Sequence, residues 1–191
     1  FLYKIKADSV AAEYLGEIEV QGFSDDDAKV FGMFYKKAKE IGANSFAFKA
    51  FEEVDGQLSK FDPVHYKLSL YYTDSKNFPK EDNVIYLISG ANKKQTISIN
   101  NDKISFEPRT YTKMNLLPGE VYTISTRKLL GSTIKLTAQN NQPVQYFQIS
   151  GFGVNTNQNG TAGVNLKSGD IIRLEQSYAQ FITTIYEYFK K

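Results

Sequence analysis

The chain contains no cysteine and no tryptophan, and only one of its 191 residues is a histidine. Without cysteine it forms no disulfide, offers no thiolate nucleophile and builds no cysteine-based zinc site. His65 is the one imidazole base available to a Ser-His-Asp triad, and no Gly-x-Ser-x-Gly segment presents a serine to it. Metal sites built on histidine need further ligands. We therefore predict no catalytic residue, no metal ligand and no cofactor.

Long apolar runs are also missing, because no run approaches the roughly 20 residues that a membrane-spanning helix needs. We expect no transmembrane span in this chain. Charge is close to balanced, with a net charge of +2. Residues 1–79 carry −3 and residues 80–191 carry +5. This positive charge is too dilute for a nucleic-acid footprint, so no nucleic-acid partner is predicted.

Hydrophobic residues make up 41% of the chain and charged residues 23%, which is typical of a folded globular protein. A chain of this length fits one or two domains. We predict an α+β protein with two domains, a small β-α-β-β domain over 1–79 and a mostly antiparallel β-sandwich or jelly-roll-like domain over 80–191. The polar segment 74–83 is the predicted linker.

In the first domain, residues 13–23 are predicted to form a strand with a bulge near Gly16. Ser24 is the expected N-cap of a helix over residues 25–41, whose apolar residues recur at three- and four-residue spacing. Gly42 suits the left-handed conformation that closes a helix. Strands are expected from Ser45 and over 65–73, where the period changes to two.

The second domain reads as eight short strands separated by turns, which is typical of a sandwich. Asn100-Asn101-Asp102 and Pro118-Gly119 are predicted turns, and residues 151–165 are predicted to form a long loop. The eight predicted strands span 84–89, 95–100, 103–107, 111–116, 121–126, 133–138, 144–149 and 171–176.

After Ser177 the apolar residues again share one helical face, and Ser177 with Gln180 fits a capping box. We predict a C-terminal helix that belongs to the second domain. The β-branched run 182–185 leaves a terminal strand as the alternative.

Binding residues are sought where exposed rings or loop amides gather. Tyr71 is expected on the strand face opposite Tyr66 and Leu68, and the loop residues Asn155, Asn157 and Asn159 offer polar groups to a ligand.

Two acidic groups have alternative interpretations. Asp25, Asp26 and Asp27 suit either calcium coordination or the positive end of the helix dipole, and we favour the helix dipole. Glu17 and Glu19 share one strand face, where they are either paired carboxylates for glycoside chemistry or simply exposed glutamates.

The segment from Lys37 to Phe48, with its helix, its Gly-Ala-Asn and its following strand, resembles the YbjQ-like domains historically labelled "heavy-metal-binding". Envelope stress-sensor lipoproteins of the Rcs type use a similar unit. The turn Leu117-Pro118-Gly119-Glu120 resembles turns in β-sandwich modules of bacterial lipoproteins. Together these resemblances imply a Gram-negative cell-envelope protein that works by binding or sensing.

We therefore expect a non-enzymatic envelope protein, periplasmic, outer-membrane-associated or extracellular, that binds a protein or an envelope component. The chain opens on Phe1, which suggests an upstream export signal or lipid anchor. One alternative is a hydrolase that acts on cell-surface glycans through paired carboxylates. Another is a structural subunit that self-associates through strand edges.

Overall fold

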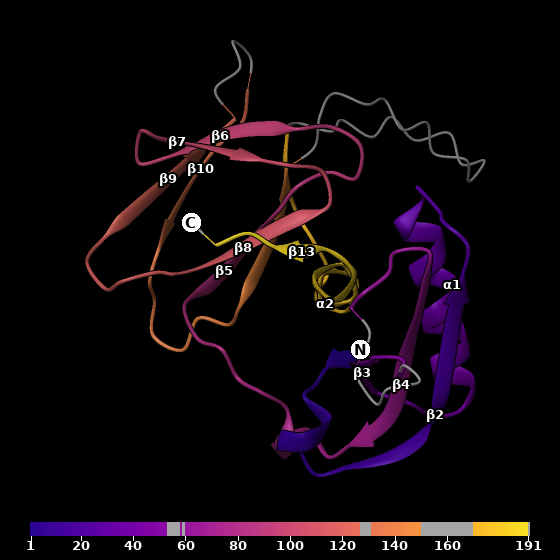
Figure 1. Ribbon diagram of the computed structural model, residues 1–191. Helices are drawn as coiled ribbons and strands as arrows, with labels where there is room; N and C mark the ends of the chain where they lie inside the picture. The colour runs from indigo at the N-terminus through magenta and orange to yellow at the C-terminus, as the bar shows by residue number, and fades with distance from the viewer. Residues whose placement is uncertain (53–57, 59, 127–130, 150–169, 191) are drawn as a thin grey trace, which may run out of the picture. The chain divides into compact units, whose positions relative to one another are not determined.

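The computed structural model describes residues 1–52, 58, 60–126, 131–149 and 170–190 (Figure 1). Over these residues the chain is a β-rich α+β protein, as predicted. It divides into two compact units. Unit 1 comprises Phe1–Lys80 and Glu175–Glu187, and unit 2 comprises Glu81–Leu174 and Tyr188–Lys191. The division after Lys80 falls within the segment predicted as the linker.

Unit 1 is built on a four-stranded sheet in the order β1-β3-β4-β2. β1 runs parallel to β3, whereas β4 is antiparallel to both β3 and β2. The register of β2 against β4 shifts between Tyr14 and Gly16, which confirms the predicted bulge. The strands are β1 (Tyr3–Lys4), β2 (Ala12–Gln21), β3 (Ser45–Lys49) and β4 (His65–Thr73). Two short 3-10 helices, η1 (Ala7–Ser9) and η2 (Ser75–Asn77), belong to the same unit.

The helix α1 (Asp27–Glu40) packs on one face of this sheet. Phe34 of α1 is buried, and its ring centroid lies 5.3 Å from that of Phe46 on β3. Gly42 follows the helix with a φ of +80°, which confirms the predicted left-handed position.

The predicted N-cap of α1 was wrong. Asp26, not Ser24, caps the helix, since its carboxylate accepts a hydrogen bond of 3.0 Å from the backbone N–H of Lys29. Ser24 instead accepts the N–H of Asp26 at 3.2 Å. Serine and aspartate are both favoured at the N-cap, but α1 begins at Asp27, so Asp26 and not Ser24 occupies that position.

The helix α2 (Gln176–Ile185) confirms the predicted C-terminal helix over the alternative strand. Its placement in the second domain was wrong, because α2 lies within unit 1. Phe181 stacks on Phe34 of α1 with ring centroids 5.4 Å apart, and both rings are buried. The domain to which a helix belongs depends on the core that its apolar face packs against, not on its position along the chain.

The predicted capping box of α2 was also wrong. Glu175 is the N-cap, and its carboxylate accepts the backbone N–H of Tyr178 at 3.0 Å. Ser177 and Gln180 instead accept hydrogen bonds from the N-terminal residues of the chain. The backbone N–H of Leu2 donates to Ser177 Oγ at 3.0 Å, and that of Lys4 donates to Gln180 Oε1 at 2.7 Å.

Unit 2 contains two sheets, in the orders β10-β9-β6-β7 and β12-β11-β5-β8-β13. β5 and β11 are parallel, whereas β10 and β9, β9 and β6, β6 and β7, β12 and β11, and β5 and β8 are antiparallel. Both sheets contribute side chains to one buried core, among them Ile97 and Ile124 from the first sheet and Ile85 and Leu87 from the second. The strands are β5 (Val84–Ile88), β6 (Gln95–Ile99), β7 (Asp102–Phe106), β8 (Thr110–Asn115), β9 (Val121–Ser125), β10 (Thr133–Thr137), β11 (Gln145–Ile149), β12 (Ile171–Arg173) and β13 (Glu187–Tyr188).

Strands β5 to β11 begin and end within one residue of their predicted bounds. Asn100 and Asn101 have φ values of 49° and 77°, and Gly119 has a φ of 82°, so both predicted turns are confirmed. β12 ends three residues earlier than predicted, because Glu175 begins the capping of α2. The predicted loop 151–165 lies outside the described residues.

The two helices have 14 and 10 residues, and neither is long and apolar enough to span a membrane. Within the described part of the chain this agrees with the prediction of no transmembrane span.

Candidate functional site

The sheet of unit 1 has two unlike faces, because successive side chains of a strand point to opposite sides. Phe46, Leu68 and Leu70 are buried on the side where Phe34 of α1 packs. Polar side chains occupy the other side in register. Gln21 pairs with His65, Glu19 with Lys67, and Lys67 with Lys49. We call this side the charged face; it consists of Tyr14, Glu17, Glu19, Gln21, Lys49, His65, Lys67 and Tyr71.

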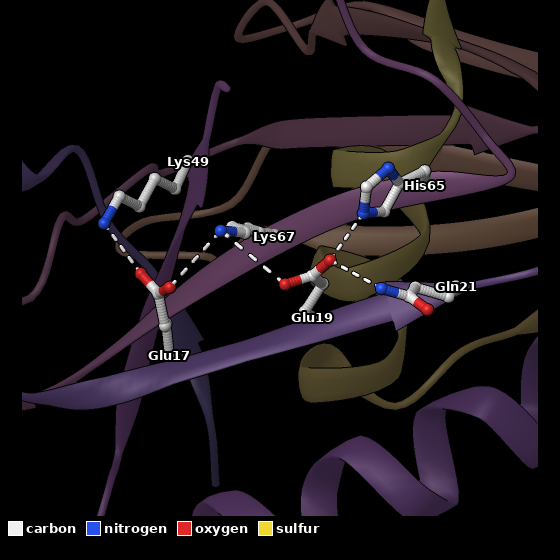
Figure 2. A network of polar contacts seen from close by, with 6 residues as sticks. All are labelled: Glu17, Glu19, Gln21, Lys49, His65 and Lys67. Atoms are coloured by element: carbon white, nitrogen blue, oxygen red, sulfur yellow. Dashed lines mark hydrogen bonds and ion pairs between the residues drawn. The ribbon is translucent and has the colours of Figure 1, made fainter. Parts of the chain in front are cut away.

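A continuous network of hydrogen bonds and ion pairs crosses the charged face (Figure 2). Glu17 lies 2.7 Å from Lys49 and 3.6 Å from Lys67. Lys67 also lies 3.6 Å from the carboxylate of Glu19, so one ammonium group bridges the two glutamates.

The far end of the network contains the single histidine. His65 Nε2 lies 2.5 Å from Glu19 Oε1, and the side-chain amide of Gln21 donates to the same oxygen at 2.8 Å. These side chains come from three strands, β2, β3 and β4, that are adjacent only in the folded sheet.

Both glutamates are held in their ionised form. The hydrogen bond with His65, followed by that from Gln21, lowers the pKa of Glu19 to about 2. The hydrogen bond from Lys49 lowers the pKa of Glu17, and the same contact raises the pKa of Lys49. Because both carboxylates are ionised at neutral pH, the negative charges of Glu17 and Glu19 alternate with the positive charges of Lys49 and Lys67.

Aromatic rings lie at both ends of the network. Tyr14 and Tyr71 form an edge-to-face pair with ring centroids 5.7 Å apart, and Tyr14 is 55% exposed. At the other end, the ring of Phe51 lies 4.4 Å from that of His65, and the ammonium group of Lys67 lies 4.8 Å from the Phe51 centroid. The network of paired charges therefore has the exposed ring of Tyr14 and the half-buried ring of Tyr71 at one end and the half-buried ring of Phe51 at the other.

The predicted binding residues have different outcomes. Tyr71 lies on the face opposite Tyr66 and Leu68, where the alternation of β4 placed it. Asn155, Asn157 and Asn159 lie outside the described residues.

Lys49, Lys67 and Gln21 were missed as site residues. The alternation of β4 puts Lys67 on the same strand face as Tyr71, and this signal was enough to suggest a shared surface. The alternation within one strand does not predict how β3 and β2 pair with β4, so the partners of Lys67 could not be predicted.

Two residues of the acidic cluster at the start of α1 have structural roles. Asp26 caps the helix, and the buried Asp27 accepts a hydrogen bond from the hydroxyl of Tyr186 at 2.7 Å. Over the ranges that the structure describes, no three His, Asp or Glu side chains gather in a group that would hold a metal ion.

A second aromatic group lies on the β5 sheet of unit 2. The rings of Tyr86 and Tyr146 stack with centroids 4.9 Å apart, and Tyr86 donates its hydroxyl to Glu81 at 2.9 Å. Glu81 also pairs with Lys113, which lies over the Tyr86 ring. Burial, followed by the bond to Glu81, raises the pKa of Tyr86, so this hydroxyl remains a hydrogen-bond donor.

The chain matches no protein-family model, and it is not significantly similar to any curated protein or solved structure. Its function must therefore be inferred from the chemistry of its own surfaces.

Proposed function

We propose that the protein is a non-enzymatic binding protein of the bacterial cell envelope and that the charged face of unit 1 contacts a protein partner. One observation carries this proposal: the exposed ring of Tyr14, paired with the half-buried ring of Tyr71, lies on the same face as charges that are already paired and ordered. Tyrosine is enriched in protein interfaces because it supplies a large apolar surface at low cost in conformational entropy.

The charge pattern favours a protein over a charged polymer as the partner. Glu17, Lys49, Lys67 and Glu19 alternate in sign across the face, and they contribute no net charge. A complementary surface needs the same alternation with opposite signs, which a mixture of acidic and basic side chains provides. Because the ion pairs already hold these side chains in place, binding costs less side-chain conformational entropy.

A glycan hydrolase is the second candidate, since Glu17 and Glu19 share one face and one bridging ammonium group. Glycoside hydrolysis needs one carboxyl group whose pKa is raised, so that it carries a proton to donate at neutral pH. The pKa values of Glu17 and Glu19 are both lowered instead. The electrostatics therefore support binding over general acid catalysis.

The envelope location and an upstream lipid anchor belong to the same proposal, and so does the jelly-roll-like sandwich assignment of unit 2. The first two rest on the resemblance of residues 37–48 and 117–120 to units of envelope lipoproteins. The third is supported by the single core that the two sheets of unit 2 share. Fractionation of cells expressing the natural gene tests the location, and recovery of the protein in the cytosol would contradict it.

The binding surface is tested by site-specific photo-crosslinking in such cells. A photoreactive amino acid replaces Tyr14 on the charged face or, as a matched control, Tyr72 on the other side of the sheet. The two positions are similarly exposed, at 55% and 53%. We expect a discrete adduct with one protein from position 14 and none from position 72.

Further substitutions separate the two candidate functions. Lys67→Gln removes the bridging ammonium group and should abolish the position-14 adduct. Equal adducts from both positions, or none from position 14, would contradict the binding surface. Glycan hydrolysis that is lost in Glu17→Gln and Glu19→Gln would instead establish the hydrolase.

A further inference from the structure

The outer face of the β10-β9-β6-β7 sheet carries a row of hydroxyl groups. Thr133 of β10 pairs with Ser125 of β9, Ser125 with Ser98 of β6, and Ser98 with Lys103 of β7. One side-chain row therefore crosses all four strands. It points away from the core, because the residues between these positions along each strand pack inward.

Neighbouring rows continue this pattern on β9 and β10. Lys135 pairs with Thr123, and Thr137 pairs with Val121. Lys135 and Thr137 are exposed on β10, whose alternate residues Ile134 and Leu136 pack against the core.

The row on β6 and β7 pairs Thr96 with Ser105, whose hydroxyl oxygens lie 3.1 Å apart. With this row, ten outward positions on the four strands are occupied by seven serines and threonines, two lysines and one valine. None of the ten is acidic or aromatic. We call these ten positions the hydroxyl face; they are Thr96, Ser98, Lys103, Ser105, Val121, Thr123, Ser125, Thr133, Lys135 and Thr137.

The two lysines of the hydroxyl face differ from those of unit 1. Lys49 and Lys67 each contact a carboxylate, whereas Lys103 and Lys135 are exposed and form no ion pair with any residue in the described ranges. An array of hydroxyls with two unpaired ammonium groups presents a uniformly positive, hydrogen-bonding surface.

From this arrangement we infer that the hydroxyl face binds an anionic polysaccharide. Each serine or threonine hydroxyl both donates and accepts, as do the hydroxyls of a sugar chain. Strands lie about 4.8 Å apart and alternate residues about 6.8 Å apart, so the grid suits an extended polymer that makes several contacts. Ammonium groups recognise carboxylate or phosphate substituents as point charges.

Other occupants fit this face less well. A single-stranded nucleic acid needs aromatic rings for base stacking, and none lies among the ten positions. A duplex needs a larger basic patch than two lysines. A second copy of the same face would oppose lysines with lysines and offer them no carboxylate. The inference does not depend on the proposed function, because it concerns another surface on another unit.

The test measures binding of the purified whole chain to immobilised polymers at low and moderate salt. Polygalacturonate is the anionic glycan, dextran the neutral glycan, poly-glutamate the anionic polymer without sugar hydroxyls, and duplex DNA the nucleic acid. We expect polygalacturonate to bind at least about tenfold more tightly than dextran or poly-glutamate, with an affinity that falls as salt rises.

Two variants locate the site. Lys103→Gln combined with Lys135→Gln should weaken polygalacturonate binding about tenfold. The control Lys36→Gln combined with Lys37→Gln makes the same charge change on the exposed side of α1, and it should alter binding less than about twofold.

Thr133→Val combined with Thr137→Val removes two exposed hydroxyls at nearly constant shape and should weaken binding about threefold. Equal losses in both lysine double variants, or equal binding of poly-glutamate, would overturn the inference in favour of unspecific charge attraction. Tighter binding of DNA would overturn the inference in favour of a nucleic acid. A mass that doubles with concentration and returns to that of the monomer in Thr123→Arg, which adds a further positive charge in the middle of this face, would overturn it in favour of a second copy.

Discussion

Tyr186, directly after α2, donates a 2.7 Å hydrogen bond to the carboxylate of Asp27, the first residue of α1. The two residues are 159 positions apart in the chain, and both are buried. The contact joins the C-terminal segment of unit 1 to its N-terminal segment. It also explains why an aspartate is tolerated inside the unit, since a buried carboxylate needs hydrogen-bond donors.

Tyr186→Phe should therefore destabilise unit 1. The substitution keeps the ring and removes the donor, and loss of a hydrogen bond to a charged group costs about 1.5–3 kcal/mol. Urea denaturation of the whole chain measures this change. Tyr35→Phe on α1 is the control, because the described structure gives the Tyr35 hydroxyl no hydrogen bond, and its effect should stay within about 0.5 kcal/mol. Equal effects of the two substitutions would contradict the role of the Asp27 contact.

The assignment of α2 to unit 1 predicts where a core substitution acts. Phe181→Ala removes a buried ring that stacks on Phe34, and it should cost about 3–5 kcal/mol. Hydrogen exchange should then accelerate in β1 to β4 and much less in β5 to β11. Phe106→Ala in the core of unit 2 should produce the reverse pattern. Acceleration confined to unit 2 after Phe181→Ala would show that α2 belongs there.

Local signals predicted much of the secondary structure. The change from a helical period to a period of two places the boundary between α1 and β3, and Gly42 has the positive φ that its position suggested. The hairpin between β6 and β7 follows from Asn100 and Asn101, which tolerate positive φ. In each of these cases a few neighbouring residues determine the conformation.

Features that depend on distant contacts could not be predicted. β1 has two residues, too few for any periodicity, and it exists because it pairs with β3. α2 was placed in the wrong domain because its amphipathic pattern shows that one face is buried but does not show which core that face packs against. Glu17 and Glu19 were placed on one face, but their partner Lys67 depends on the pairing of β2 with β4.

Two glycines should respond in opposite directions to alanine. Gly32 lies exposed within α1, and a Cβ there meets no atom within 4 Å, so Gly32→Ala should stabilise the protein by about 0.5–1 kcal/mol. Gly42 has a φ of +80°, which an L side chain rarely adopts, and Gly42→Ala should destabilise by about 1 kcal/mol. Denaturant titration of both variants checks the pair. Stabilisation by Gly42→Ala would contradict the left-handed conformation.

The contact between Glu19 and His65 predicts a pH-dependent contribution to stability. The folded pKa of Glu19 is about 2, whereas an unfolded glutamate has a pKa near about 4.3. Because the folded pKa is the lower one, the stabilising contribution is present above about pH 4.3 and is lost as the pH falls towards 2. Glu19→Gln removes the titrating group, so the difference in urea midpoint between wild type and variant should shrink over this interval.

Glu13→Gln provides the matched control for that titration. Glu13 is exposed on the same strand, and the described residues offer it no ion pair or hydrogen-bond partner. Its substitution changes the net charge as Glu19→Gln does, so any general effect of charge appears in both variants. Only the difference caused by Glu19 should narrow between about pH 4.3 and 2, because only its carboxylate has ordered partners to lose. If the difference in urea midpoint between wild type and Glu19→Gln stays constant over this range, the contact with His65 does not contribute to folding stability.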